Sequence, residues 1–442
     1  MDTFRTFRKL IFCIADQVLF SATHFLISLY FGRVLTPSQY GAFSIVYATF
    51  LLVLTIHYGL VLEPMIVLGS TRYEDLSRRY IRSVLIANSG LGVIFGFLAA
   101  LVLAISQAFN REVITAALYF GASCPFLLTA YVLRRACYVL DQPSKALVAS
   151  GIYLVVSVIT IAAISTMQRL ETASVFVALS IGAVVSSFIM WKLLRLQSHL
   201  RPGTALLKDA IVEHWRYGRW ATGCLFLNWM FLALYYPVLG RAAGLESAAT
   251  LRAFDNFTLP IPQLLTALSI LFLPRIARLI TAENQRAALK LAMRLTMAAV
   301  GLCGLYFGPL CFLGADVARL VYPHRPYSQS VWLLPWICLV ITLKSISDFG
   351  MGLFLRASNR PDLSFNILRV GAILTLVCSL IFCATWGIAG AVFGRVTAVV
   401  GEIFFGVWYM SRLSEKELRP SGQLDRIREP NSVVSWQEQG GL

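Results

Sequence analysis

Long apolar runs, each near the length of a membrane-spanning helix, follow one another along most of this chain. A helix needs about 20 mostly apolar residues to cross the hydrocarbon core of a bilayer, and short polar turns separate the runs here. Only 14% of the 442 residues are charged and 58% are hydrophobic, a charged fraction well below that of a soluble domain. The sequence therefore predicts an all-α polytopic membrane protein with no soluble domain of useful size.

The apolar runs predict about 12 spans. They lie near residues 10–31, 40–62, 83–106, 113–133, 146–166, 173–194, 217–239, 248–273, 291–314, 329–355, 364–385 and 386–411. Only a short polar gap, near Trp386-Gly387, divides the last two. The polar segment 413–442 is rich in turn formers and predicts a cytoplasmic tail without fixed structure.

The basic residues are distributed unevenly over the loops. Alternating assignment of the loops places roughly 29 basic residues on the side of the N-terminus and roughly seven on the other side. Cytoplasmic loops carry such an excess, so both termini are expected in the cytoplasm. Basic loops beside anionic lipid headgroups also account for the net charge of +16 without a nucleic-acid partner.

A short pattern occurs twice, as Gly32-Arg33 and again as Gly240-Arg241, each followed by a helix start and an apolar span. Each copy leads to a proline, Pro64 or Pro274, after 32 and 34 residues respectively. In the first copy Thr36 is expected to cap the next helix, with proline at its first position. An arginine at a helix end commonly reaches the membrane interface, and we expect this of Arg33.

The repeat predicts two halves of six spans that begin on the same side of the membrane. Such parallel repeats are related by an axis along the membrane normal and face each other across a central cavity. We expect an N-terminal lobe over residues 1–200 and a C-terminal lobe over residues 201–412.

The first copy of the repeat contains a Leu-x-Pro-x-x-Tyr-Gly turn at residues 35–41. This turn resembles polysaccharide transporters of the multidrug/oligosaccharidyl-lipid/polysaccharide superfamily, whose fold is MATE-like. The segments "LPIPQLLTALSILFLPRIARL" and "LVYPHRPYSQSVWLLPWI" of the second half are similar to matching elements of these flippases. The resemblance spans roughly residues 8–412 and is more specific for the fold than for the substrate.

The resemblance implies a flippase of the bacterial inner membrane that serves lipopolysaccharide or exopolysaccharide synthesis. A saccharide on an isoprenoid diphosphate would cross from the cytoplasmic to the outer leaflet by alternating access. No bond is made or broken, so no enzyme activity and no cofactor are expected, and an ion gradient would drive transport. Membrane lipids, a polysaccharide polymerase and chain-length proteins are the expected partners.

Ionisable residues inside spans are functional-site candidates by default, because a charge at mid-membrane costs about 2.5–3.5 kcal/mol on insertion scales. Under the flippase hypothesis Arg252, Lys344 and Arg395 would bind the diphosphate headgroup. The candidates for ion coupling or charge pairing are Asp16, His24, Asp255, Asp348 and Glu402. No metal site is expected. The alternative is that these groups form local ion pairs that fix helix packing.

Neighbours in sequence indicate which of these groups share a helix face. Lys344 and Asp348 are four residues apart, and Arg395 and Glu402 are seven apart. Arg252, Asp255 and Asn256 form a third cluster. The flippase cavity is expected to be basic in both lobes, but mid-span cations occur only in the second half. Either Arg82, Arg134 or Arg135 reaches inward, or the headgroup site is one-sided.

Two other classes of protein compete with the flippase. A multidrug or cation antiporter of the same superfamily would need uncompensated acids facing its cavity, whereas acids and bases are nearly balanced here. A membrane enzyme of polysaccharide assembly would need a catalytic motif, and the sequence contains no Asp-x-Asp, no nucleotide-binding loop and no H-E-x-x-H.

Overall fold

A computed structural model gives the structure of the chain and describes residues 2–106, 110–167, 170–196, 204–282, 284–358 and 360–412. The predicted tail, 413–442, lies outside the described residues. In the described ranges the chain forms helices and no strand, so the prediction of an all-α protein is confirmed.

The N-terminal half consists of nine helical elements within the described ranges. They are α1 (Asp2–Val34), α2 (Pro37–His57), the π-helix η1 (Tyr58–Leu62), α3 (Glu63–Gly69), the 3₁₀ turn η2 (Glu74–Leu76), α4 (Ser77–Ser106), α5 (Arg111–Val139), α6 (Pro143–Thr166) and α7 (Thr172–Leu193).

The second half is more interrupted. Its elements are α8 (Thr204–Ala233), α9 (Tyr235–Ala242), α10 (Leu245–Thr258), α11 (Pro260–Thr281), α12 (Gln285–Val321), the 3₁₀ segment η3 (Pro326–Leu333), α13 (Leu334–Ser345), the π-helix η4 (Ile346–Met351), α14 (Gly352–Ala357) and α15 (Pro361–Arg412).

The surface carries the apolar side chains that a membrane protein requires. By length and composition, ten helices in the described part of the chain could cross a membrane, or eleven if the bent pair Pro260–Thr266 and Leu271–Ile280 forms one span. Phe312 is 90% exposed and Leu320 77%. Exposed apolar surface of this extent marks contact with lipid or a partner rather than water, and the protein is a multi-pass membrane protein.

The long element α15 folds back on itself. At Gly387 the backbone leaves the helical region, with φ 56° and ψ −129°, a left-handed conformation that glycine adopts without steric cost. A Cβ atom built on Gly371 would lie 2.3 Å from Glu402, and one built on Gly401 would lie 2.3 Å from Leu374. The two arms are therefore packed antiparallel, and the chain turns where the sequence placed the division between the last two spans.

One predicted span is broken. The sequence predicts one span over 248–273 whose helix is interrupted by Pro260 and Pro262, and in the structure α10 ends at Thr258 and α11 begins at Pro260. Proline has no N–H to donate to the preceding turn, and its ring clashes with the carbonyl four residues earlier. The span is therefore interrupted after Leu259.

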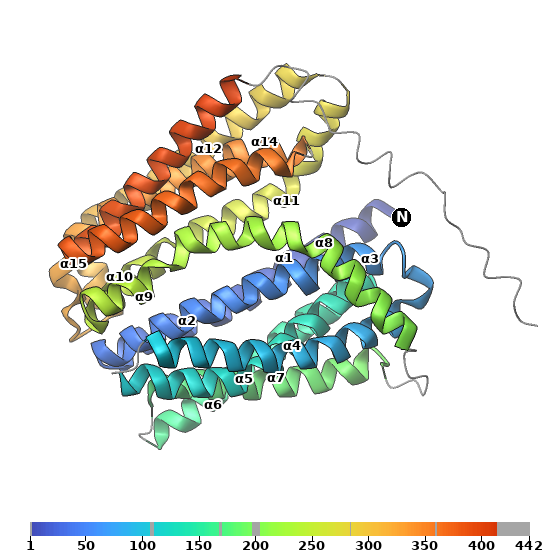
Figure 1. Cartoon of the computed structure of the whole chain (residues 1–442), viewed down its shortest axis with the longest axis horizontal. Coiled ribbons are helices and arrows are strands. Elements are labelled where there is room, and N and C mark those ends of the chain that lie inside the picture. The colour runs from blue at the N-terminus through green and yellow to red at the C-terminus, as the bar shows by residue number, and fades with distance from the viewer. Residues whose placement is uncertain are drawn as a thin grey trace, which may run out of the picture.

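The helices gather into two groups, as Figure 1 shows. Elements α1 to α7 lie mainly in the lower part of that view, α11 to α15 lie mainly in the upper part, and α9 and α10 lie at the left between them. Element α8 runs between the two groups. The sequence assigned residues from 201 onward to the C-terminal lobe, but the first half of α8 packs against η1, α3 and α4 of the N-terminal group.

A close helix crossing and two hydrogen bonds of His214 hold the first half of α8 on the N-terminal group. Gly59 and Gly218 allow a close crossing, because a Cβ on Gly218 would lie 2.5 Å from the Gly59 carbonyl oxygen. Burial lowers the pKa of His214 to about 4, so its imidazole is neutral at pH 7. The neutral ring donates from Nδ1 to the Leu60 carbonyl at 3.1 Å and accepts at Nε2 from the Tyr80 hydroxyl at 2.6 Å.

The repeated sequence pattern lies where the two groups meet. The predicted cap is present: Thr36 Oγ1 accepts from the Gln39 N–H, and Gln39 Oε1 accepts from the Thr36 N–H, both at 3.2 Å. Arg33 is exposed in the last turn of α1, as expected. Helix α2, which this cap starts, packs against α10, which follows the second copy. A Cβ on Gly41 of α2 would lie only 2.0 Å from the Leu245 carbonyl oxygen of α10.

We expect Gly41→Ala to lower the thermal stability of the purified protein, because the added methyl group must separate α2 from α10. The matched control is Gly301→Ala in α12, where a Cβ meets nothing within 4 Å. Alanine in an open helix position is favourable by roughly 0.5–1 kcal/mol relative to glycine. Melting followed by tryptophan fluorescence measures both, and equal melting temperatures for the two variants would contradict the close approach at Gly41.

Candidate functional site

Most of the ionisable residues predicted from the sequence are buried inside the helix groups. The following are at most 9% exposed: Asp16, Arg252, Asp255, Lys344, Arg395 and Glu402. The two exceptions are Asp348, whose side chain is 47% exposed, and His24, which is half-buried. The structure divides these residues, apart from His24, among three ion-pair networks and one separate cation.

The first network ties α1 to α5 and α6 in the N-terminal group. Arg134 of α5 makes a two-pronged contact with Asp16 of α1, with Nε to Oδ1 at 2.9 Å and a terminal nitrogen to Oδ2 at 2.7 Å. Tyr138 and Ser150 donate their hydroxyl groups to the same carboxylate. The Arg134 guanidinium also lies 4.1 Å from the centre of the Phe20 ring. Asp16 is thus fully hydrogen-bonded within the protein.

The second network joins α10 to the second arm of α15. Arg395 donates to both carboxylate oxygens of Asp255, each at 2.9 Å. Tyr236 of α9 donates its hydroxyl group to Asp255 as well. A further nitrogen of Arg395 donates to the Leu232 carbonyl at 3.3 Å, near the end of α8. The charge predicted for substrate binding at Arg395 is therefore neutralised by Asp255.

The third network holds Lys344 of α13. Its Nζ atom lies 2.8 and 3.1 Å from the two oxygens of Glu402 in α15, and 3.1 Å from Asp348 in η4. Ser347 donates its hydroxyl group to Glu402 at 2.5 Å. The contact of Lys344 with Asp348, four residues later, agrees with the predicted shared helix face. The shorter contact of Lys344 is with Glu402, which lies 58 residues later in the sequence.

Two groupings made from sequence spacing do not form pairs. Arg395 and Glu402, seven apart in α15, bind Asp255 and Lys344 respectively rather than each other. Asp255 lies one turn from Arg252 in α10 but pairs with Arg395. In a bundle, a helix face meets the neighbouring helices, so an ion pair across helices competes with the neighbour on the same helix.

Arg252 is the separate cation. It is 6% exposed, and in the ranges that the structure describes no carboxylate lies within ion-pairing distance of it. Its Nε donates to the Ser28 hydroxyl of α1 at 3.2 Å. Its guanidinium lies 4.6 Å from the centre of the Tyr47 ring in α2 and 5.9 Å from that of Tyr236 in α9. The positive charge thus lies among side chains from both helix groups.

A chain of neutral polar groups surrounds Arg252 and crosses the boundary between the groups. Ser28 of α1 donates to Asn256 Oδ1 of α10 at 3.0 Å. The amide nitrogen of Asn256 donates to the hydroxyl groups of Tyr40 and Tyr322, at 2.8 and 3.0 Å. These groups supply hydrogen bonds to Arg252 and its neighbours but no negative charge.

His24 is next to this region on α1. Its Nε2 lies 3.4 Å from the Tyr131 hydroxyl, and its ring lies 6.3 Å from that of Tyr47. Its Nδ1 is buried without a hydrogen-bond partner. The ring lies among aromatic side chains of the N-terminal group, and one of its nitrogens has no hydrogen bond within the described part of the chain.

Sequence reasoning left the role of Arg134 open. The predicted span 113–133 ends one residue before it, whereas α5 continues to Val139. Arg134 is 4% exposed, so it is the residue of the three alternatives that reaches inward. Arg135 lies over the rings of Tyr58 and Tyr138. The sequence contained one indication of this ion pair, namely Asp16 within the first predicted span and Arg134 directly after the fourth.

Metal ligation has no structural basis in the described part of the chain, where no group of three or more His, Cys, Asp or Glu side chains is arranged to hold an ion.

The fold matches that of transporters of the MOP superfamily. The chain is similar to an inward-facing multidrug resistance transporter of the MATE family, with TM-score 0.70, 14% identity and coverage of 89% of this chain and 94% of that chain. It is similar to the lipid II flippase MurJ in an inward closed conformation, with TM-score 0.70, 14% identity and coverage of 94% and 88%. For the eukaryotic MATE transporter AtDTX14 the values are 0.65, 15%, 94% and 98%.

The sequence also identifies the family. The profile of the family described as polysaccharide biosynthesis protein matches residues 31–322, more than half of the chain, and the protein belongs to this family. No curated protein sequence matches the chain. The resemblance to polysaccharide transporters with a MATE-like fold is thus confirmed.

We predict that Asp16→Leu and Arg134→Met each destabilise the protein by about 3–5 kcal/mol, because each leaves a buried charge without its partner. The double variant is expected to recover most of this loss, since no uncompensated charge remains. Unfolding of the purified protein, analysed as a double-mutant cycle, measures the coupling.

The control cycle uses Asp316→Asn and Arg319→Gln. This pair in α12 is 73% and 69% exposed, so little coupling is expected. Additive losses at Asp16 and Arg134 would show that the buried pair does not act as a unit.

Proposed function

We propose that the protein moves a lipid-linked oligosaccharide, a saccharide on an isoprenoid diphosphate, from the cytoplasmic to the outer leaflet by alternating access of its two lobes. The family description names polysaccharide biosynthesis. The matching structures include a flippase of another lipid-linked substrate, lipid II. The second of these supports transport rather than catalysis, and no covalent step is part of the proposal.

The observation that carries the proposal is the environment of Arg252. The other buried cations, Arg134, Lys344 and Arg395, are each neutralised by a carboxylate. Arg252 lies among hydroxyl groups, an amide and aromatic rings at the boundary between the lobes. A buried guanidinium without a carboxylate favours an anionic ligand, and guanidinium geometry suits the oxygens of a phosphate group.

This pattern of charges revises the predicted headgroup set. Arg395 lies near Arg252, since both guanidinium groups are within 6 Å of the Tyr236 ring centre, at 5.7 and 5.9 Å. Because Asp255 balances the charge of Arg395, this arginine holds neighbouring side chains in position more than it attracts the ligand. Lys344 belongs to a separate network with Glu402. In our proposal Arg252 is the main diphosphate contact.

The same charges weigh against a multidrug or cation antiporter, although a MATE transporter is among the similar structures. A cation exporter needs an acid that is not already neutralised. Asp16 and Asp255 are each bound to an arginine, whereas Glu402 and Asp348 share Lys344 and leave one acid of that network in excess. His24 remains as a group that could exchange a proton, and we keep it as the candidate for ion coupling.

The proposal also includes the setting. The excess of basic residues in one set of loops supports a cytoplasmic position for both termini. The protein would lie in the bacterial inner membrane beside a polysaccharide polymerase and chain-length proteins of lipopolysaccharide or exopolysaccharide synthesis. Each elementary charge moved across 100 mV supplies about 2.3 kcal/mol, which makes an ion gradient a sufficient drive.

In cells that lack the protein, we expect isoprenoid-diphosphate-linked saccharide to accumulate in the inner leaflet. Re-expression of the wild type or of Arg33→Ala, a matched exposed arginine, should reverse the accumulation. Arg252→Ala should fail to reverse it while folding normally. Arg252→Lys should restore it in part, because lysine keeps the charge but loses the planar hydrogen-bonding group.

Mass spectrometry of the lipid-linked saccharides with a leaflet-accessibility assay measures this outcome, and gel filtration confirms equal amounts of folded protein. Full reversal by Arg252→Ala would exclude Arg252 as the headgroup contact. Absence of accumulation in the deletion strain, together with a lost capacity to expel a cationic dye, would favour the antiporter.

A further inference from the structure

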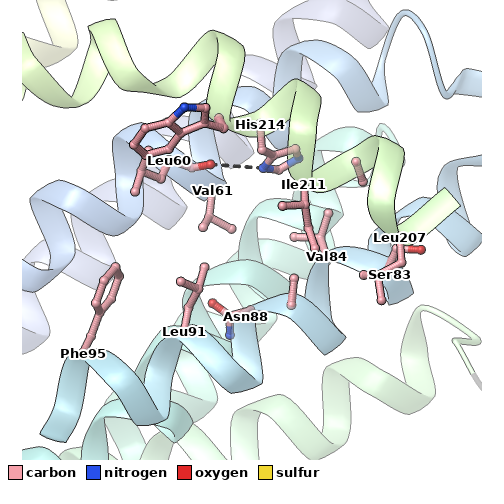
Figure 2. A pocket seen from close by; sticks show the side chains of 13 residues that line it. Leu60, Val61, Ser83, Val84, Asn88, Leu91, Phe95, Leu207, Ile211 and His214 are labelled. Carbon is pink, nitrogen blue, oxygen red and sulfur yellow. Dashed lines mark hydrogen bonds between the residues drawn. The ribbon is translucent and has the colours of Figure 1, made fainter. Parts of the chain in front are cut away.

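An apolar slot lies outside the proposed headgroup site, between α4, the region of η1 and the first half of α8. Figure 2 shows it in close view, with Phe95 and Leu91 of α4 toward one end and Leu207 of α8 with Ser83 toward the other. Its volume is about 220 Å³. Apolar cavities of roughly 150 Å³ stay dry and take up benzene-sized hydrocarbons, so the α4–α8 slot is large enough for part of a hydrocarbon chain.

Three of the polar side chains that line the slot, Ser83, Asn88 and His214, are hydrogen-bonded within the protein. Ser83 donates to a backbone carbonyl of its own helix at 3.2 Å. Asn88 contacts His57 at 2.7 Å and donates to Thr129 at 3.2 Å. Both ring nitrogens of His214 are bonded to the protein. The slot therefore presents a hydrocarbon surface.

The slot extends along part of α4. The part of α4 between Ser83 and Phe95 lines the slot and is about 18 Å long at 1.5 Å per residue. One leaflet contributes about half of a hydrocarbon core of about 30 Å. The neighbouring surface of α4 faces lipid, since Val93 is 60% and Phe97 66% exposed. A single acyl chain of the surrounding leaflet matches this length and position.

The mouth of the slot, at Leu207 and Ser83, is basic. Lys208 follows Leu207 on α8, and Arg79 precedes Ser83 by one turn on α4; both are exposed. The nearby acids, Asp209 and Glu213, are bound by Arg72 at 3.2 and 3.0 Å and so do not cancel these cations. A basic mouth above an apolar slot complements a lipid with a negatively charged headgroup.

We propose that the α4–α8 slot binds an anionic phospholipid of the leaflet that the basic loops face. One acyl chain occupies the slot, and the phosphate lies at Arg79 and Lys208. The substrate's isoprenoid chain is a poorer match, because α10, the helix that contains Arg252, lies toward the opposite end of the molecule from the labelled part of α8 (Figure 1). The lipid contacts both α4 and α8, so its binding stabilises the docking of α8 on the N-terminal lobe.

The test uses the full chain purified in a neutral detergent, with phosphatidylglycerol or phosphatidylcholine added. Native mass spectrometry counts bound lipid, and tryptophan fluorescence follows melting. We expect phosphatidylglycerol to bind and to raise the melting temperature more than phosphatidylcholine. Ala87→Phe fills the slot and should abolish this difference, whereas Val93→Phe, on the exposed side of the same helix, should retain it.

A second pair of variants covers the case in which Ala87→Phe does not fold. Arg79→Gln and Lys208→Gln alter only exposed side chains, and each should weaken the preference for phosphatidylglycerol about fivefold. An unchanged preference in both variants would overturn the proposal. It would also be overturned if Ala87→Phe bound phosphatidylglycerol like the wild type, or if the lipid retained from the cell membrane proved to be an isoprenoid diphosphate. None of these readouts depends on the proposed transport activity.

Discussion

The cost of a charge in a hydrocarbon medium organises the interior of this protein. An ionised side chain removed from water needs a partner of opposite charge and further hydrogen bonds. Asp16 has both, with Arg134, Tyr138 and Ser150 around one carboxylate. Because the partners come from different helices, each pair also fixes how those helices lie against one another.

Each of the buried ion pairs lies within one lobe. This distinguishes the charges that stabilise the fold from the charge that we propose binds the ligand. Asp16 with Arg134 binds α1 to α5, whereas Asp255 with Arg395 and Lys344 with Glu402 bind helices of the C-terminal half. Lobes that are held together internally by such ion pairs can move as rigid units. Arg252 differs because its contacts reach Ser28 and Tyr47 of the other lobe and bring no negative charge.

Local features of the fold were predictable because their causes lie within a few residues. The cap at Thr36 and the turn at Gly387 are examples, since capping and left-handed backbone depend on adjacent side chains. The break after Leu259 was visible as Pro260, but a proline within an apolar span is often tolerated as a kink. The two prolines, Pro260 and Pro262, indicated an interruption of the predicted span 248–273, and in the structure α10 ends and α11 begins there.

The pairing of charges could not be predicted in the same way. Asp16 and Arg134 are 118 positions apart, and only helix packing brings them together. Spacing along one helix placed Arg395 with Glu402 and Asp255 with Arg252 on shared faces, whereas in the structure Arg395 binds Asp255 and Glu402 binds Lys344. A single sequence gives the face on which a residue lies, whereas the partner depends on which helix that face meets.

The position of Arg252 has a consequence for how ligand binding and lobe movement are connected. The hydroxyl of Ser28 and the amide of Asn256 join α1 to α10 beside this arginine. A diphosphate bound at Arg252 would compete for the same donors and thereby weaken contacts that hold the lobes together. A ligand shifts a conformational equilibrium only through its different affinity for the two states. In the proposed cycle that difference arises here, because the state with these inter-lobe bonds intact offers the diphosphate fewer free donors.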